Sequence, residues 1–408
     1  MAASPAWEND INLEEALKKL VRQNLPRRDI LNYIIINKYT LINIHYNWSI
    51  RTIDRRLRHF NIYYSDTTVT VEKVQEVVKD ELEGPGRLLG YRAMQQKVRQ
   101  KHLLNVPRAL VYDVMYDLSP EDLANRRPGH KEKKEKSNFV TKGINWVWSL
   151  DGHDKLMGYQ NWTFPLAVYG CSDTASRKLL WLRVWDSNSK PELIGKWYLE
   201  HLCKTNIIPA YIRIDKGTET GVMATMQSHL RRNCEDLDDP TESVCYGPST
   251  SNQIERWWKE LHERLEKYFK DGLQWLTEER HYDPHNEADR NIMKYVMIPL
   301  IQRELDEFRE IVWNTHRIRK QKNTILPDGI PNHIYDFPQE YDLLECGFPV
   351  NDKELEDVAD LSNVLSETTE DYIDEAFRNK CQNILPDPAK ISATKYVESY
   401  LLLKSNIT

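Results

Sequence analysis

Two strongly apolar segments of the chain end in an aspartate, and this pattern constrains the fold more than any other feature. The first segment, NWVWSLDGHDKL at residues 145–156, is rich in Trp until Asp151, where the charged residues begin. The second, AYIRID at residues 210–215, ends in Asp215. Charged groups are rarely left buried without a partner, and the usual partners are a hydrogen-bond network or a metal ion. One sheet that holds both segments would place both carboxylates at the same edge.

The periodicity around these segments predicts an α/β domain with a mixed sheet. The predicted strands lie at 145–151, 163–173, 178–185 and 210–215, and the predicted helices at 191–206, 222–233 and 252–270. We expect Asp173 to anchor the hairpin between the second and third of these strands. Trp257 and Trp258 are expected to pack the last helix against the sheet.

A third carboxylate, Glu255, lies near the start of the helix predicted over 252–270, and Lys259 follows one turn later on the same face. Cleavage or exchange of a phosphodiester requires an activated water or 3′-hydroxyl and neutralisation of charge on the attacking and leaving oxygens. Two Mg²⁺ ions do both, and such hard cations prefer carboxylate oxygens. Asp151, Asp215 and Glu255 are therefore candidate ligands of two Mg²⁺ or Mn²⁺ ions, with Asp154 and Glu219 as nearby alternates.

In combination these segments resemble the catalytic core of integrases and transposases, and in particular a eukaryotic transposon-derived family. The resemblance rests on Asp151 after Trp148, the hairpin CSDTASRKLLWLRV at 171–184, DKGTE at 215–219 and YGPSTSNQIERWWKELHE at 246–263. It implies a ribonuclease-H-like fold, with a mixed five-stranded sheet and helices, preceded by all-α helix-turn-helix modules. On this fold Asp151, Asp215 and Glu255 are the catalytic, metal-binding triad. The interval between Asp215 and Glu255 is close to the one that characterises the retroviral-type group.

The chain departs from retroviral integrases at two points. No cysteine precedes Cys171, so the N-terminal zinc site of those enzymes is missing. Lys216 stands where their common motif has an asparagine after the aspartate, and we expect it to contact phosphate. Neither departure touches the triad.

The residues before the predicted sheet are basic and helical, although the whole chain has a formal charge of −6. The segment SIRTIDRRLRHFNI at 49–62 places Ile50, Ile53, Leu57 and Phe60 on one stripe, with Ser49 as a helix cap and arginines on the other faces. It resembles the recognition helix of a helix-turn-helix unit. The residues expected to contact DNA are Arg51, Arg55, Arg56, Lys216, Arg256 and Lys259.

The predicted domains follow from changes in composition and period. They are an N-terminal helix-turn-helix-like domain at 1–85, a second helical DNA-binding module at 86–125, a basic linker at 126–143, the catalytic core at 144–275, a helical extension at 276–350 and an acidic tail at 351–408. The stretch 351–375 of this tail has few aromatic residues and is expected to be partly disordered. The basic segment at 313–323 is either a further DNA contact or a solvated helix end.

The cysteines and the termini bear on location. Six scattered cysteines without a CxxC pair indicate reduced thiols, and a zinc site built from Cys234, Cys245, His281 and His285 matches no known spacing. We expect no membrane segment and no secretion signal, and therefore an intracellular protein. A nuclear location is expected from the resemblance to a eukaryotic DNA-processing family.

Three functions stay open at this level. The first is a DNA integrase or transposase that cleaves DNA ends and joins them to a target as a homo-oligomer. The second is a domesticated DNA-binding protein without strand transfer, and the third is a ribonuclease-H-like nuclease. The intact triad favours the first over the second, and the helical modules before the core favour it over the third.

Overall fold

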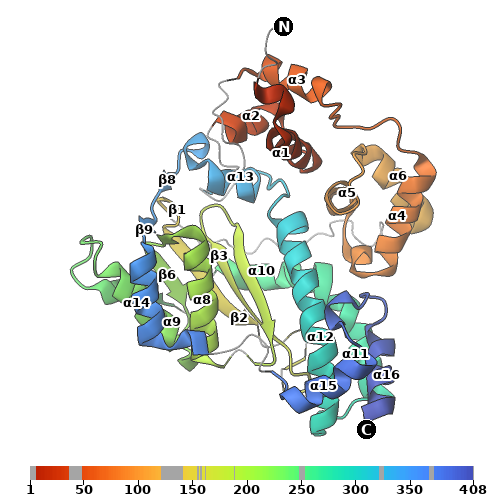
Figure 1. The fold of residues 1–408 in the computed structure, drawn as a ribbon, viewed down its shortest axis with the longest axis vertical. Helices are drawn as coiled ribbons and strands as arrows, with labels where there is room; N and C mark the ends of the chain where they lie inside the picture. Colours follow the sequence, from red (N-terminus) through yellow and green to blue (C-terminus); the bar gives the residue numbers. More distant parts are fainter. Residues whose placement is uncertain are drawn as a thin grey trace.

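The computed structural model describes residues 6–35, 48–120, 141–153, 156, 159–160, 162–187, 189–247, 253–320, 326–366 and 372–407. In Figure 1 a central sheet lies between two layers of helices, and two smaller helical modules sit at the upper end. The chain up to Leu118 forms these two modules, and the residues from Gly143 onward form the sheet and its helices.

The central sheet has five strands and is mixed, as the sequence predicts. In spatial order the strands are β4 (Leu179–Trp185), β3 (Ala167–Asp173), β2 (Val147–His153), β6 (Tyr211–Ile214) and β7 (Val244–Tyr246). β2, β3 and β4 are antiparallel neighbours, whereas β6 and β7 run parallel to β2. Together with the helices this arrangement is that of a ribonuclease-H-like core. β7 was not predicted, since three residues are too few to show a period.

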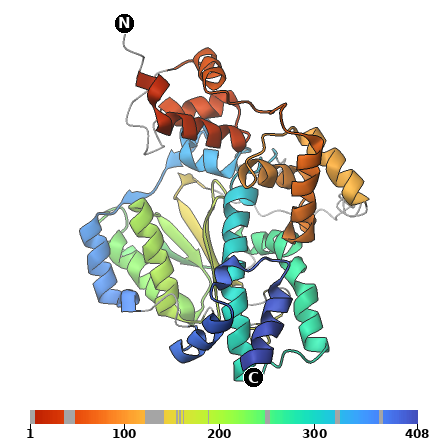
Figure 2. The same ribbon diagram turned by 45° about the vertical axis from the view of Figure 1, so that its right-hand side comes forward.

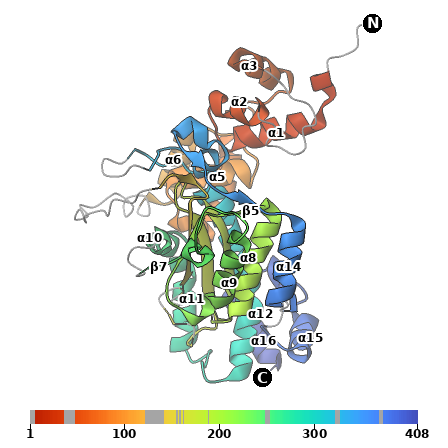
Figure 3. The same ribbon diagram turned by 90° about the vertical axis from the view of Figure 1, so that its left-hand side faces the viewer.

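Each face of the sheet is covered by a different set of helices (Figure 3). α8 (Pro191–Thr205), α9 (Gly221–Arg231) and α14 (Asp352–Ser362) bury one face, to which Leu150 and Tyr169 belong. α10 (Gln253–Leu261) and α12 (Glu287–Glu307) bury the other. Because side chains alternate along a strand, Asp151 faces the side of α10. The packing against α12 continues past the predicted core boundary at residue 275.

The acidic C-terminal segment is folded where the structure describes it, and within 351–375 the prediction of partial disorder is wrong for residues 351–366 and 372–375. α11 (Lys267–Glu278), α15 (Glu375–Ile384) and α16 (Tyr396–Ile407) pack around α12, and α14 packs on α8. Tyr400 of α16 is fully buried, and Lys404 donates a hydrogen bond to Asp289 at 2.8 Å. The acidic side chains lie on the outer faces of these helices, so net charge was a poor guide to disorder.

The N-terminal module consists of three helices that share a core with a distant segment. They are α1 (Ile11–Arg22), α2 (Arg27–Ile35) and α3 (Ile50–His59), and they pack on α13 (Pro331–Asp336). The Tyr33 hydroxyl donates to Asp336 at 2.9 Å, and the Tyr33 ring meets Phe337 edge-on at 4.6 Å. A short turn at residues 23–26 joins α1 to α2. Residues 36–47, which connect α2 to α3, lie outside the described ranges.

The second module begins earlier than predicted. α4 (Val71–Glu83), α5 (Tyr91–Gln100) and α6 (Arg108–Leu118) form one hydrophobic core, so α4 belongs to this module and the predicted boundary at residue 85 lies inside it. In Figure 2 the module lies alongside α12.

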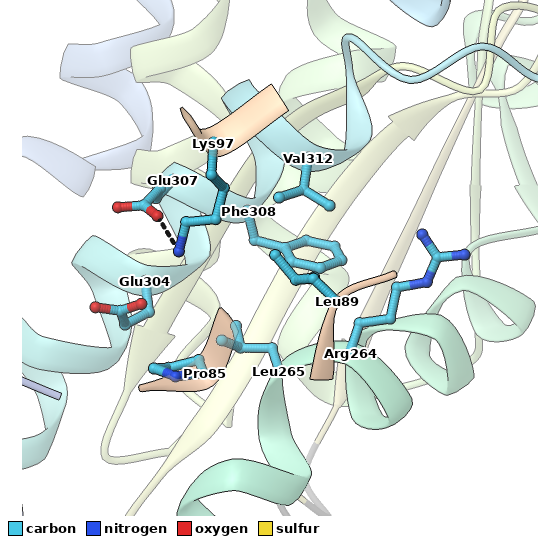
Figure 4. Close-up of a pocket in the computed structure, with 9 residues that line it drawn as sticks. All are labelled: Pro85, Leu89, Lys97, Arg264, Leu265, Glu304, Glu307, Phe308 and Val312. Atoms are coloured by element: carbon cyan, nitrogen blue, oxygen red, sulfur yellow. Dashed lines mark ion pairs between the residues drawn. The ribbon is translucent and has the colours of Figure 1, made fainter. Parts of the chain in front are cut away.

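Buried ion pairs join the second module to the catalytic half of the chain. Lys97 of α5 lies 2.6 Å from Glu81 of α4 and 2.5 Å from Glu307 of α12, and Lys101 bridges the same two carboxylates. Burial alone would lower the pKa of Lys97, but Glu307 and Glu81 outweigh it and raise the pKa. Figure 4 shows the ion pair between Lys97 and Glu307 beside a small pocket. The residues that line the pocket are Pro85, Leu89, Lys97, Arg264, Leu265, Glu304, Glu307, Phe308 and Val312.

Arg99 joins the two helical modules and is 1% exposed. Its guanidinium donates to the carbonyls of Val21 and Arg22, at the end of α1, and to those of Tyr64 and Val106. Burial lowers the pKa of Arg99 to about 10. The side chain therefore satisfies backbone acceptors that α1 leaves open at its C-terminus.

We expect Arg99→Met to lower the free energy of unfolding by about 3–5 kcal/mol, because four backbone carbonyls, two of them in buried hydrogen bonds, lose a charged donor. Arg92→Met in the same helix is the matched control, since Arg92 is exposed and should change stability by less than about 0.5 kcal/mol. Urea unfolding of both variants measures the difference. Equal stability of the two variants would contradict this role of Arg99.

Candidate active site

The two strand-associated aspartates lie level with each other on neighbouring strands. Strands β2 and β6 are parallel neighbours, and Ser149 and Arg213 are the paired residues nearest their C-terminal ends. Continuing this register by two residues places Asp215, just past the end of β6, beside Asp151. Neighbouring strands are about 4.8 Å apart, so the two backbones are close enough for their carboxylates to serve one site. The predicted meeting of these two positions at one sheet edge is therefore supported by the register.

The hydroxyl of Tyr169 reports on the charge at this edge. Tyr169 is buried on β3, and its hydroxyl has no hydrogen-bond partner among the described residues. Burial raises the pKa of Tyr169 well above its ordinary value, and the charges of Asp151, Glu219 and Asp215 raise it further. All three carboxylates are therefore within electrostatic range of this hydroxyl. A divalent cation held among them would relieve their mutual repulsion.

Helix α10 brings position 255 to Asp151. Glu255 is the third residue of the helix, in the first turn as predicted. One turn later the Trp258 indole Nε1–H donates a hydrogen bond to Asp151 Oδ2 at 2.9 Å, which ties this helix to β2. Positions three apart are neighbours on a helix surface, so position 255 lies on the side of α10 near Asp151. The side chains of Glu255 and Arg256 lie outside the described residues, and the convergence of the full triad stays a prediction.

The close approach of α10 depends on a glycine in β3. Gly170 is the direct partner of Asp151 across the β2–β3 pair. A Cβ at Gly170 would lie 2.8 Å from Leu182 Cδ2 of β4, 3.0 Å from Trp258 Cη2 and 3.3 Å from Ile254 Cδ1, the last two being side chains of α10. A larger residue would push the helix outward from the sheet, so Gly170 sets the distance between α10 and Asp151.

A second layer of polar groups lies behind Trp258. The ring of His153 stacks on Trp258 with centroids 5.0 Å apart, and its Nε2 is 3.1 Å from Glu266 Oε1. Glu266 Oε2 lies 3.0 Å from His262 Nδ1. Burial alone would raise the pKa of Glu266, but contacts with His153 and His262 outweigh it and lower the pKa. His262 and Glu266 bound the π-helical turn η7 (His262–Glu266), a type of insertion found often at functional sites.

Comparison with known protein families identifies this region. A family described as "Integrase core domain" matches residues 139–334, which include all five strands of the sheet, α10 and most of α13. This part of the chain is an integrase core domain. The resemblance to an integrase core is thereby confirmed, whereas the eukaryotic transposon-derived origin stays a prediction. Compared with curated proteins as whole chains, the protein has no match.

Several predicted residues occupy the expected places in the integrase core. Lys216 follows Asp215 and is exposed, and Lys259 is exposed on α10. Asp173 accepts hydrogen bonds from the Asn145 and Ser176 amides, each at 2.8 Å, and so anchors the hairpin as predicted. Trp257 and Trp258 pack the helix on the sheet, also as predicted. The alternate residue Asp154 lies outside the described residues.

The function of Trp258 as a donor to Asp151 was missed, because a Trp on the apolar face of a helix normally indicates packing alone. Its position three residues after Glu255 was the available signal. His153 stood out in the sequence beside Asp151, but its partner Glu266 could not be found without the fold. The contacts of Trp258 with Asp151 and of His153 with Glu266 lie around the predicted triad, and the sequence motif of the triad does not include these partners.

The arginines of α3 divide into two groups. Arg51 and Arg55 are exposed, as the DNA-contact prediction requires. Arg56 instead lies over the Trp7 ring, 3.4 Å from its centroid, so its guanidinium packs within the module. Ile53 and Leu57 are buried as predicted, whereas Ile50 is 44% exposed at the start of the helix.

We expect the double variant Arg51→Ala/Arg55→Ala to bind DNA more weakly and to lose up to about two units of salt slope, roughly one per phosphate contact. Folding should be unaffected, because both side chains are exposed. The comparison is Arg56→Ala, which should lower stability through the lost Trp7 contact. Binding measured across a salt series would count against α3 as the DNA-contacting helix if the double variant kept the wild-type slope.

The alternative zinc site finds no support in the part of the chain that the structure describes. There, Cys234, Cys245, His281 and His285 do not form a group that could hold a metal ion. All six cysteines are free thiols. Among the described helices none is long and apolar enough to cross a membrane.

Proposed function

We propose that this protein is a DNA strand transferase that uses Mg²⁺ or Mn²⁺, held by Asp151, Asp215 and Glu255, to cut DNA ends and join them to a target. The observation that supports it most is the adjacency of Asp151 and Asp215 in register, with α10 tied to Asp151 through Trp258. The integrase core domain supplies the class of reaction, since enzymes with this core act on DNA.

The residues present fit divalent metal ions. The donor set is made of hard carboxylate oxygens, which suit Mg²⁺ and Mn²⁺ better than softer metals. Burial is the main cause of the raised pKa of the Tyr169 hydroxyl, and the charges of Asp151, Glu219 and Asp215 add to it, which supports a concentration of negative charge near this sheet edge. Asp151 would contact both ions, and Asp215 and Glu255 would each complete the ligands of one. Bound metal would activate the attacking water or 3′-hydroxyl and neutralise charge on the phosphate.

The remaining residues of the site would bind the DNA substrate or position helix α10. Lys259 and Lys216, exposed at the carboxylate edge, would hold DNA phosphates through charge. Gly170 keeps α10 close enough to the sheet for position 255 to complete the site. The exposed Arg51 and Arg55 of α3 would bind DNA away from the reacting bond. Assembly as a homo-oligomer on DNA and a nuclear location are further parts of this proposal.

A joining assay with randomised ends tests the function without knowledge of the end sequence. The full chain is incubated with Mg²⁺, a plasmid and short duplexes of random terminal sequence, and junctions are amplified and sequenced. We expect junctions with an enriched end sequence, which Asp151→Asn abolishes. Nicked plasmid without junctions would indicate a nuclease, and DNA binding without either product would indicate a domesticated DNA-binding protein.

A further inference from the structure

Trp258 connects helix α10 to Asp151, a predicted metal ligand. Its Nε1–H donates to Asp151 Oδ2 at 2.9 Å, and both residues are buried. We propose that Trp258 is a positioning residue, whose indole N–H orients the Asp151 carboxylate for the divalent ion. This inference rests on the proposed metal-binding function of Asp151.

An indole suits this task because of its hydrogen-bonding chemistry. It donates one hydrogen bond, accepts none and carries no charge. A lysine or arginine at the same place would also fix the carboxylate, but its positive charge would repel the metal ion. A neutral donor orients Asp151 while leaving its negative charge for the cation, as partners of metal-binding carboxylates commonly do.

Trp258 is itself held in place on several sides. His153 stacks on its ring with an interplanar angle of 8°, and Trp257 meets it at 64° with centroids 5.2 Å apart. The far edge of the indole occupies the space left by Gly170, opposite Asp151 on β3. The ring therefore has little freedom to turn its N–H away from the carboxylate.

The stacking ring of His153 is anchored in turn. Its Nε2 is 3.1 Å from Glu266, a carboxylate that is 2% exposed, and Glu266 is also 3.0 Å from His262. His153 lies two residues after Asp151 on β2, so both side chains emerge on the same face of the sheet. The π-helical turn, His153 and Trp258 thus form one continuous support for Asp151.

The helix provides a matched control at the neighbouring position. Trp257 is buried like Trp258, but its Nε1 has no hydrogen-bond partner among the described residues. Replacement of either Trp by Phe exchanges the bicyclic indole for a single phenyl ring and removes one N–H from the same core. Only the change at position 258 removes a donor to Asp151.

The test measures Mn²⁺ binding to the full chain by calorimetry without DNA, and the Mg²⁺ concentration that gives half-maximal joining. We expect Trp258→Phe to weaken both about 10- to 100-fold, and Trp257→Phe to leave both within about twofold of wild type. If Trp258→Phe lowers the thermal midpoint too far, replacement of Trp258 by 3-benzothienylalanine keeps the ring size and removes only the N–H.

The outcomes separate this inference from the proposed function. Wild-type affinity in the variants lacking the position-258 N–H, or an equal loss in Trp257→Phe, would overturn the role of Trp258 while leaving the metal site intact. A wild-type protein that binds no Mn²⁺, or binds it equally well as Asp151→Asn, would overturn both.

Discussion

Asp151→Asn should abolish metal-dependent joining, with a loss of about 10³-fold or more, because it removes the ligand expected to contact both ions. The fold should persist, since the Asn carbonyl can still accept the hydrogen bond from Trp258. Without metal, the thermal midpoint should be equal to or above that of wild type, because one of three neighbouring carboxylates is gone. Joining and thermal unfolding measure the two effects.

Glu219→Gln is the matched comparison for Asp151→Asn. Its charge acts on Tyr169 like those of Asp151 and Asp215, but it is not assigned to the triad. We expect it to retain most of the joining activity. If Glu219→Gln were inactive and Asp215→Asn active, the second metal ligand would be Glu219 and the assignment of Asp215 would be wrong.

Lys259→Glu should also abolish end joining, for a different reason. The side chain is exposed on α10, four residues after Glu255 on the same side of the helix. A carboxylate there would repel the DNA phosphate that the lysine is expected to hold. Mn²⁺ affinity should stay near that of wild type, and helix stability should change by only a few tenths of a kcal/mol. Crosslinking to DNA ends, joining and calorimetry measure these quantities.

The control for Lys259→Glu is the same charge reversal elsewhere on the surface. Lys353 is exposed on α14, which packs against the opposite face of the sheet. Lys353→Glu changes the net charge equally and should leave crosslinking and joining unchanged. Normal DNA crosslinking and joining by Lys259→Glu would refute the role of Lys259, and equal losses in both variants would point to a general charge effect.

The sequence predicted the core of the fold because local signals and the tertiary arrangement agree there. Apolar runs that end in Asp151 and Asp215 became neighbouring strands, and the Ile254, Trp257 and Leu261 spacing became the buried face of α10. Parallel pairing of β2 and β6 then brings the two aspartates level. The short β7 escaped because its three residues have no measurable alternation.

Other features could be recognised only from the fold. Arg56 appeared as a DNA contact because Trp7, far away in the sequence, was not known to lie beneath it. The donor to Asp151 and the contact between His153 and Glu266 likewise join residues from separate elements. The C-terminal helices are different, because Leu355, Val358 and Ala359 follow helical spacing and could have been read as a buried stripe.

The most direct test of the proposed metal site is the position of a bound metal ion. Crystals of the protein soaked in Mn²⁺ would be measured at the manganese absorption edge, where anomalous differences locate the ion. We expect an anomalous peak at about 2.2 Å from carboxylate oxygens of both Asp151 and Asp215, with Glu255 completing the site. Manganese bound elsewhere, or Asp151 and Asp215 directed to separate regions, would contradict it.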